Sequence, residues 1–134
     1  MKKALIISLT IIGIIILIYI IFCLVVSFKI NDVVNKAFQE VPYSEVDSQF
    51  VSEEYYYRIY SRYSTPDDGD CTIKYSVSFP FTIFLGPKTV VYYWYTCEEF
   101  YTNGRYSGSW DIPVKLELTF VDGHLTVTDY YEAP

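Results

Sequence analysis

The segment TVVYYWYTCEEFYTNGRYSGSWDIPVKLELTFVDGHLTVTDYYE, residues 89–132, decides the fold of this chain. It contains three runs with the composition and alternation of β-strands, at 89–101, 110–120 and 124–132. The dipeptides Asn103-Gly104 and Asp122-Gly123 lie between the runs, and both are favoured in two-residue hairpin turns. The segment therefore predicts three consecutive antiparallel strands.

A two-residue turn also fixes which residues oppose each other across a hairpin. The Asn103-Gly104 turn pairs Tyr95 with Ile112, Tyr93 with Val114 and Val91 with Leu116. The Asp122-Gly123 turn pairs Phe120 with Leu125 and Leu118 with Val127. One apolar face follows, consisting of Val91, Tyr93, Tyr95, Trp110, Ile112, Val114, Leu116, Leu118, Phe120, Leu125 and Val127.

Two further strands are expected upstream, at 53–63 and 71–79, separated by the polar turn STPDDGD at 64–70. This turn has acidic residues but lacks the alternating ligands and the terminal glutamate of a calcium-binding loop, which favours a solvated turn. The result is a five-stranded antiparallel meander.

Two registers compete for the pairing of 71–79 with the strand that begins at Thr89. A tight turn at Gly86-Pro87 gives one register, which is compatible with the apolar face only if a bulge occurs at Pro80. A disulfide between Cys71 and Cys97 gives the other, which brings apolar positions of 71–79 onto that face directly. We favour the disulfide register, which leaves 80–88 as a long loop. Its apolar residues form a hydrophobic hairpin tip: Phe81, Ile83, Phe84 and Leu85.

The N-terminal part of the chain has the character of a membrane anchor. Residues 4–28, ALIISLTIIGIIILIYIIFCLVVSF, carry no charge and would form a helix about 37 Å long. A cleaved signal peptide is the alternative, although its apolar region is usually shorter. Lys2 and Lys3 favour an N-terminus on the cytoplasmic side. We therefore expect an anchor over 1–29 and one extracytoplasmic domain over 30–134.

Between the anchor and the strands, a stripe of apolar residues with helical spacing predicts an amphipathic helix that ends before Pro42. Its members are Ile30, Val33, Val34, Ala37, Phe38 and Val41. The expected fold class is α+β, with an N-terminal transmembrane helix followed by an amphipathic helix packed on the five-stranded antiparallel meander.

The charge of the domain limits the kinds of partner that it can bind, and its cysteines suggest the compartment in which it lies. From residue 30 onward the chain has seven basic and sixteen acidic residues, a net charge of −9, which disfavours nucleic acid and anionic lipid. A cysteine pair in an exterior, oxidising compartment is typical of a disulfide, here Cys71 with Cys97.

The face of the sheet opposite the apolar one carries aromatic and basic side chains. The candidate binding residues on it are Lys74, Tyr92, Trp94, Lys115 and Tyr130. They could stack a glycan or hold an extended peptide, with Lys74 over Trp94 as a cation–π pair. The same residues could instead only stabilise the sheet through cross-strand pairs. The hairpin tip could enter lipid, contact a partner or fold back onto the sheet.

No catalytic, metal or cofactor site is indicated. His124, the only histidine, follows a turn and is expected on the outer face without a serine or second metal ligand near it. The acidic pairs Glu53-Glu54 and Glu98-Glu99 would point to opposite faces of a strand. We therefore expect a protein that is not an enzyme.

The segment WDIPVKLELTFVDGHLTVTDYYE, 110–132, is similar to the final hairpin of small NTF2-like domains outside bacterial membranes. The order of elements also resembles the cystatin-like architecture. Cystatins inhibit proteases through a Q-x-V-x-G loop, and residues 49–53 match it at Gln49 and Val51 but lack the glycine. The resemblance implies a helix laid on an antiparallel sheet.

Our leading hypothesis is a membrane-anchored, non-catalytic binding or accessory module of a cell-envelope complex, whose partners are the lipid bilayer and an envelope protein. The alternative is an immunity-type or structural membrane protein that acts through its transmembrane helix and hairpin tip.

Overall fold

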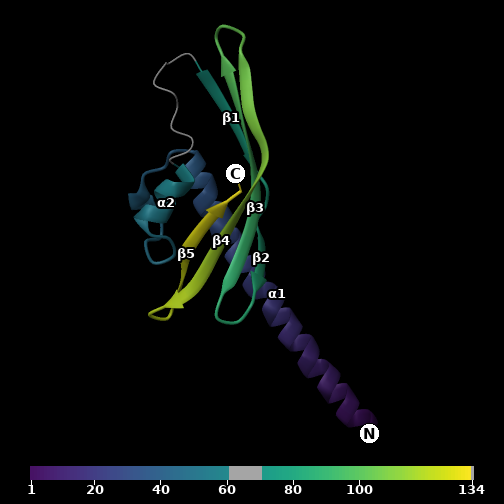
Figure 1. Ribbon diagram of the computed structural model, residues 1–134. Helices are drawn as coiled ribbons and strands as arrows, with labels where there is room; N and C mark the ends of the chain where they lie inside the picture. Colours follow the sequence, from purple (N-terminus) through teal and green to yellow (C-terminus); the bar gives the residue numbers. More distant parts are fainter. Residues whose placement is uncertain (61–70, 134) are drawn as a thin grey trace.

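A single straight helix runs from one end of the molecule into its core (Figure 1). The computed structural model describes residues 1–60 and 71–133. Helix α1 spans Lys2–Phe38, so the expected anchor and the expected amphipathic helix are one element. No proline or glycine separates Phe28 from Ile30, and the helix has no reason to end there. The apolar stripe predicted after Phe28 is buried from Ile30 to Phe38, with Ile30, Val34 and Ala37 fully enclosed, whereas Val41 lies beyond the helix and is half-buried.

Helix α1 ends in a left-handed turn rather than at Pro42. Glu40 has a φ of 58°, and the Val41 and Glu40 amides donate to the carbonyls of Lys36 and Ala37 at 3.0 and 3.1 Å. This is the double hydrogen-bond pattern of a Schellman motif, with glutamate in the place usually taken by glycine. The chain then forms the short helix η1, Tyr43–Glu45.

The strand predicted at 53–63 is wrong. Residues Glu53–Tyr60 form helix α2, and 61–63 lie outside the described residues, as does the predicted turn at 64–70. Tyr56 and Ile59, three residues apart, are both buried, and Arg58 pairs with Glu54 one turn earlier at 2.8 Å. Helical spacing therefore decides the structure, although tyrosine itself favours strands.

Five antiparallel strands form one sheet on which the helices pack, as expected, although the strands are not the expected five. Their bounds are β1 Cys71–Val77, β2 Phe81–Phe84, β3 Thr89–Tyr101, β4 Tyr106–Val121 and β5 His124–Glu132. The order is β1, β3, β4, β5, and β2 pairs with the other end of β3, so that β1 and β2 lie along the same edge (Figure 1). The long loop predicted at 80–88 is therefore partly strand β2.

The residue pairs derived from the two turn dipeptides are confirmed in the central part of the strands. Next to Asn103-Gly104, however, Phe100 opposes Tyr106, one residue away from the derived register, and the bulge between Tyr95 and Cys97 restores that register. Tyr95 opposes Ile112, Tyr93 opposes Val114 and Val91 opposes Leu116. Leu118 opposes Val127 and Phe120 opposes Leu125. Most of the predicted apolar face is core, but Trp110 and Phe120 are about half exposed, because Trp110 lies beyond a bulge and Phe120 lies near the β4–β5 turn.

The predicted disulfide register is wrong. Cys71 opposes Tyr101 and Cys97 opposes Tyr75, so the two cysteines are free thiols. The alternative turn at Gly86-Pro87 is the one present: Phe84 opposes Thr89, and the Leu85 amide donates to the Lys88 carbonyl at 2.9 Å. Gly86 has the positive φ of 82° that the first central position of a II′ turn requires.

The core lies between the sheet and the helices. Tyr93, Leu116 and Leu118 from the sheet meet Ile30 and Val34 of α1, and Tyr56 of α2 closes one side. The loop after η1 is tied to β5, because the Val127 amide donates to the Phe50 carbonyl at 2.8 Å and the Thr126 hydroxyl donates to the Gln49 carbonyl at 2.7 Å.

The disulfide register and the Gly86-Pro87 register predict different behaviour of Cys71 and Cys97, because the cysteines are free thiols only in the second. Reductant should leave the unfolding midpoint of the purified protein unchanged. Half-exposed Cys71 should react with a thiol reagent in the folded state, whereas Cys97 should react only after unfolding, since burial encloses this thiol and raises its pKa. Mass spectrometry of the labelled protein checks both sites. A midpoint that falls in reductant would contradict this register.

Candidate functional site

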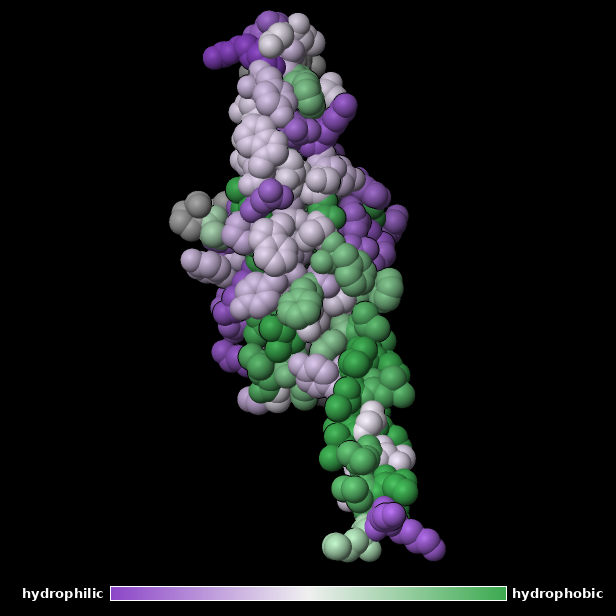
Figure 2. Space-filling view, turned by 90° about the vertical axis from the view of Figure 1, so that its right-hand side faces the viewer, coloured by the Kyte–Doolittle hydropathy of each residue, from purple (hydrophilic) through white to green (hydrophobic). Residues whose placement is uncertain are grey.

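The hairpin tip lies against the apolar part of α1. Phe84 packs its ring on Phe22 and Tyr19 at 5.1 and 6.3 Å between ring centroids, and Phe79 meets Phe28 at 5.1 Å. Figure 2 shows that the hydrophobic surface of α1 continues onto the neighbouring part of the domain. The tip is divided: Phe81 and Leu85 are 61% exposed, whereas Ile83 and Phe84 are half-buried.

Tyr19 closes the open edge of β2. Because Leu85 and Lys88 form a hydrogen-bonded pair, the alternation of an antiparallel ladder directs the amide and carbonyl of Phe84 away from β3. The Phe84 amide donates to the Tyr19 hydroxyl at 3.1 Å, and that hydroxyl donates to the Phe84 carbonyl at 3.3 Å. One side chain of α1 thus satisfies both polar groups that the strand leaves open here.

A second polar contact joins the same elements one residue before the end of the apolar segment. The hydroxyls of Ser27 and Thr82 lie 2.6 Å apart and are buried. Between α1 and β2 runs an open apolar groove of about 630 Å³, whose lining includes Ile20, Cys23 and Leu24 from the helix and Phe79 and Phe81 from the hairpin. Cys23 is one of its wall residues.

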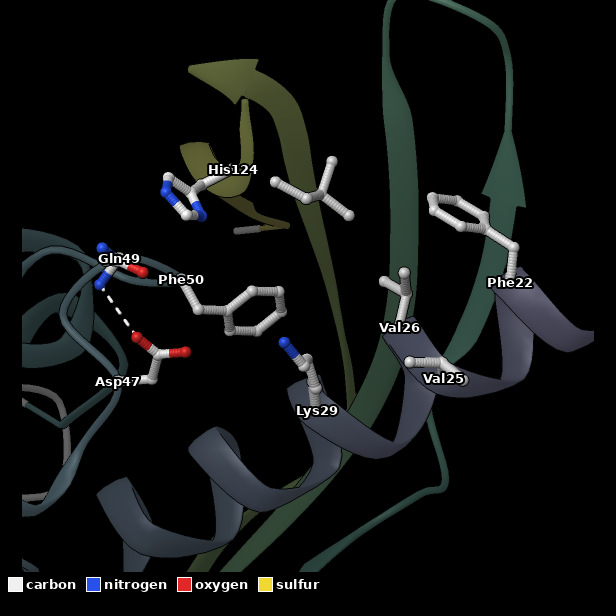
Figure 3. A pocket seen from close by; sticks show the side chains of 9 residues that line it. Phe22, Val25, Val26, Lys29, Asp47, Gln49, Phe50 and His124 are labelled. Carbon is white, nitrogen blue, oxygen red and sulfur yellow. Dashed lines mark hydrogen bonds between the residues drawn. The ribbon is translucent and has the colours of Figure 1, made fainter. Parts of the chain in front are cut away.

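On the other side of α1 lies a smaller pocket with a mixed lining, called here the interface pocket (Figure 3). Its volume is about 240 Å³, and its lining comprises Phe22, Val25, Val26, Lys29, Asp47, Gln49, Phe50, His124 and Leu125. The Lys29 ammonium stands 5.2 Å from the centroid of the Phe50 ring, and the backbone amide of Gln49 donates to the Asp47 carboxylate at 3.0 Å. His124 therefore lines a pocket beside α1, in contrast to the expected outer face.

The predicted binding face of the sheet is assembled only in part. Tyr92 opposes Lys115, and Trp94, 42% exposed, opposes Pro113, as expected. Lys115 donates to Glu117 at 2.8 Å, and Lys88 does so at 3.1 Å, which lowers the pKa of the Glu117 carboxyl.

Two residues of the predicted binding face, Tyr130 and Lys74, do not lie beside the other three. Tyr130 is half-buried against the core, because a bulge opposite Glu117 and Leu118 shifts β5 by one residue and places Tyr131 across from Lys115 instead. Lys74 opposes Glu98 rather than lying beside Trp94, and its ammonium stands over the Phe100 ring at 5.2 Å. The wrong register of β1 accounts for the second error.

An aromatic cluster at the far end of the β3–β4 hairpin was missed by the sequence reasoning. Tyr106 lies 5.1 Å from Phe100 and 5.9 Å from Trp110, and all three rings are exposed. Glu98 accepts hydrogen bonds from the Tyr106 hydroxyl at 2.7 Å and the Trp110 indole at 3.3 Å, which lowers its pKa. We call these four residues the distal cluster.

The register derived from the Asn103-Gly104 turn places Phe100 close to Tyr106, so the sequence could have predicted that these two rings are neighbours. The bulge at Trp110 and Asp111 has no comparable signal in the sequence, so the position of Trp110 could not have been predicted.

The described part of the chain holds no cluster of side chains suited to bind a metal ion. No group of three or more His, Cys, Asp or Glu side chains converges among the residues 1–60 and 71–133. Within the same residues, α1 is the helix long and apolar enough to cross a membrane, a property that it shares with signal sequences.

No family model, curated protein or solved structure matches this chain. The resemblance to cystatin-like and NTF2-like domains therefore stays a prediction.

The contact between Tyr19 and Phe84 can be tested by removing one oxygen atom. Tyr19→Phe should destabilise the protein by about 1–2 kcal/mol, because the amide and carbonyl of Phe84 lose their partner while the ring packing is kept. Tyr131→Phe, at an exposed tyrosine of β5, is the matched control and should have no effect. Unfolding in detergent micelles measures both variants, and equal midpoints would contradict the role of Tyr19.

Proposed function

We propose that this protein is a single-pass membrane protein with its N-terminus inside the cell and a non-catalytic exterior domain that acts as a binding or accessory module of an envelope complex. The observation that carries the proposal is that α1 is at once a helix of membrane-spanning length and the central helix of the domain core. A span of residues 4–28 is about 37 Å long, against a hydrocarbon layer of about 30 Å.

The contacts of β2 support this placement of α1. Tyr19 is nine residues before Phe28, so it lies about 14 Å along the helix from the end of the apolar segment. The hairpin tip held by Tyr19 would then enter the outer half of the bilayer. Backbone polar groups in lipid must be satisfied within the protein, and the two hydrogen bonds between Tyr19 and Phe84 meet that requirement at Phe84, on the open edge of β2.

In this orientation the sheet holds its binding residues away from the bilayer. From Thr89 to Tyr101, β3 extends for twelve residue steps, about 40 Å, and the distal cluster lies at the end opposite the hairpin tip (Figure 1). Tyr92, Trp94 and Lys115 lie nearer the tip on the outer face, and the distal cluster is mostly aromatic, with Glu98 as its acid. Such a surface suits a protein partner rich in aromatic or basic groups, and a glycan is a further candidate ligand.

A second candidate function is an immunity-type or structural role exerted through α1 and the hairpin tip. Residues 4–18 of α1 are exposed on all sides and leave the helix free to pack against another membrane protein.

The proposed topology predicts the location of both ends of the chain. A reporter fused after Pro134 should be active only in the exterior compartment, and the mature protein should retain Met1 to Phe28, because Val26 belongs to the core and Tyr19 and Phe22 hold Phe84 of the hairpin tip. Enzyme reporters at either terminus and N-terminal sequencing of the membrane protein check this. A mature chain that begins near Phe28 would contradict the anchor.

The two functions differ in the part of the protein that a partner needs. Replacing residues 4–18 with an unrelated apolar helix should leave partner capture intact if the exterior domain binds, because these residues do not contact it. Trp94→Ala should then reduce capture with little change in stability, since this side chain is exposed, and Tyr57→Ala on α2 is the control. Cross-linking in membranes, followed by quantitative mass spectrometry, compares the variants. Loss of the captured partner on helix replacement alone would favour the second function.

A further inference from the structure

The interface pocket has the polarity gradient of a lipid molecule. Its walls on α1 run from Phe22 to Lys29, seven residues or about 10 Å of helix. Phe28, the last residue of the uncharged segment, falls within that range. If α1 spans the membrane as proposed above, the pocket lies where the hydrocarbon layer meets the headgroups.

We propose that the interface pocket binds the headgroup of a zwitterionic phospholipid that carries a primary amine, of the phosphatidylethanolamine class. This inference rests on the proposed function, because only a membrane-spanning α1 places the pocket at the level of the headgroups.

The two charges in the pocket match the two charges of such a headgroup. Lys29 can pair with the phosphate, and Asp47 can accept hydrogen bonds from the ammonium. Lys29 and Asp47 do not form an ion pair with each other in the structure, in contrast to Lys36 and Asp32, which lie 2.9 Å apart on the same helix. The Asp47 carboxylate has one oxygen bonded to the Gln49 amide, which leaves the other for a ligand.

Other side chains of the pocket extend this match. The Phe50 ring, buried beneath the Lys29 ammonium, forms an apolar wall of the pocket, and the His124 imidazole can donate a hydrogen bond to a phosphate oxygen (Figure 3). Phe22, Val25 and Val26 form the apolar side, where the glycerol and the first carbons of the acyl chains would lie.

The same charges argue against the other common headgroups. A phosphatidylglycerol headgroup has a negative charge and no cation, so it leaves Asp47 without a partner and adds to the acidic character of the domain. A choline headgroup is cationic but has no N–H to donate to Asp47. The volume of about 240 Å³ is below the range of about 300–1,000 Å³ for pockets that hold whole ligands, which suits one end of a molecule whose remainder lies in the bilayer.

The test uses the full-length protein in nanodiscs of equimolar phosphatidylethanolamine, phosphatidylglycerol and phosphatidylcholine. After gentle release, native mass spectrometry counts the lipids of each class that stay bound. The wild-type protein should retain phosphatidylethanolamine above the other two, and Lys29→Gln should reduce that retention about tenfold through loss of a charge-assisted contact. Lys36→Gln, on the same helix and outside the pocket, should behave as the wild type.

Asp47→Asn tests the amine separately, because asparagine keeps an acceptor for the Gln49 amide and removes the charge. This variant should still retain lipid but lose the preference for phosphatidylethanolamine over phosphatidylglycerol. Equal retention of the three classes by the wild type would overturn the proposal, and so would Lys29→Gln that matches Lys36→Gln. Unchanged thermal unfolding of each variant ensures that lipid loss does not reflect misfolding.

Alkaline carbonate extraction of the same protein from vesicles separates this proposal from the proposed function. A protein that resists extraction but shows no lipid preference overturns the headgroup site alone. A protein released by carbonate is not anchored through α1, and both proposals then fail.

Discussion

The continuity of α1 is the constraint on which the rest of the structure depends. The helix passes from the uncharged segment into the core without a break, and Ile30 and Val34 are completely enclosed by the sheet and α2. Since a straight helix is stiff, the direction of the apolar segment and the orientation of the domain are set together. Burial of each such aliphatic side chain contributes about 1.5–3 kcal/mol, so the two cannot separate without loss of the core. In a membrane-spanning arrangement, the domain would be held in one attitude to the bilayer and would not swing on a linker.

This rigid arrangement explains why β2 needs a partner along its open edge. If α1 spans a membrane as proposed, β2 beside it would have backbone amides and carbonyls that water does not reach, and each would cost several kcal/mol if left open. Tyr19 supplies a donor and an acceptor from one hydroxyl, and Ser27 pairs with Thr82 nearer the end of the apolar segment. Directly after the Gly86-Pro87 turn, Lys88 forms an ion pair with Glu117, and the polar contacts of the outer face of the sheet begin there.

The sequence predicts the central sheet well because turn dipeptides determine local geometry. Asp122-Gly123 sets the pairing of β4 with β5 next to the turn as expected. Next to Asn103-Gly104, β3 and β4 pair one residue away from the expected register, and the bulge between Tyr95 and Cys97 restores it for the central pairs. The errors arise where contacts distant in sequence decide. The Tyr55 hydroxyl of α2 donates to the Thr128 carbonyl at 2.6 Å and stabilises the bulge that turns Tyr130 toward the core. A sequence interpretation that assigns 53–63 to a strand cannot predict this contact. The sequence favours a disulfide because that register places the apolar residues of 71–79 on the apolar face of the sheet. In the structure, a one-residue irregularity between Val77 and Phe81 places them on the same face while the cysteines stay free thiols.

The net negative charge of the domain bears on the contacts that the hairpin tip and the distal cluster can make. If the domain stands on a membrane as proposed, its net charge of −9 from residue 30 onward would repel it from an anionic bilayer surface within about one Debye length, about 8 Å at physiological ionic strength. Contact of the hairpin tip with lipid would then rest on apolar side chains, which Phe81 and Leu85 provide, and a lipid beside Lys29 would have to balance charge locally, as a zwitterionic headgroup does. The same repulsion would favour an upright domain. An upright domain would hold the distal cluster about 40 Å from the hairpin tip, where a partner could reach its aromatic rings without displacing lipid.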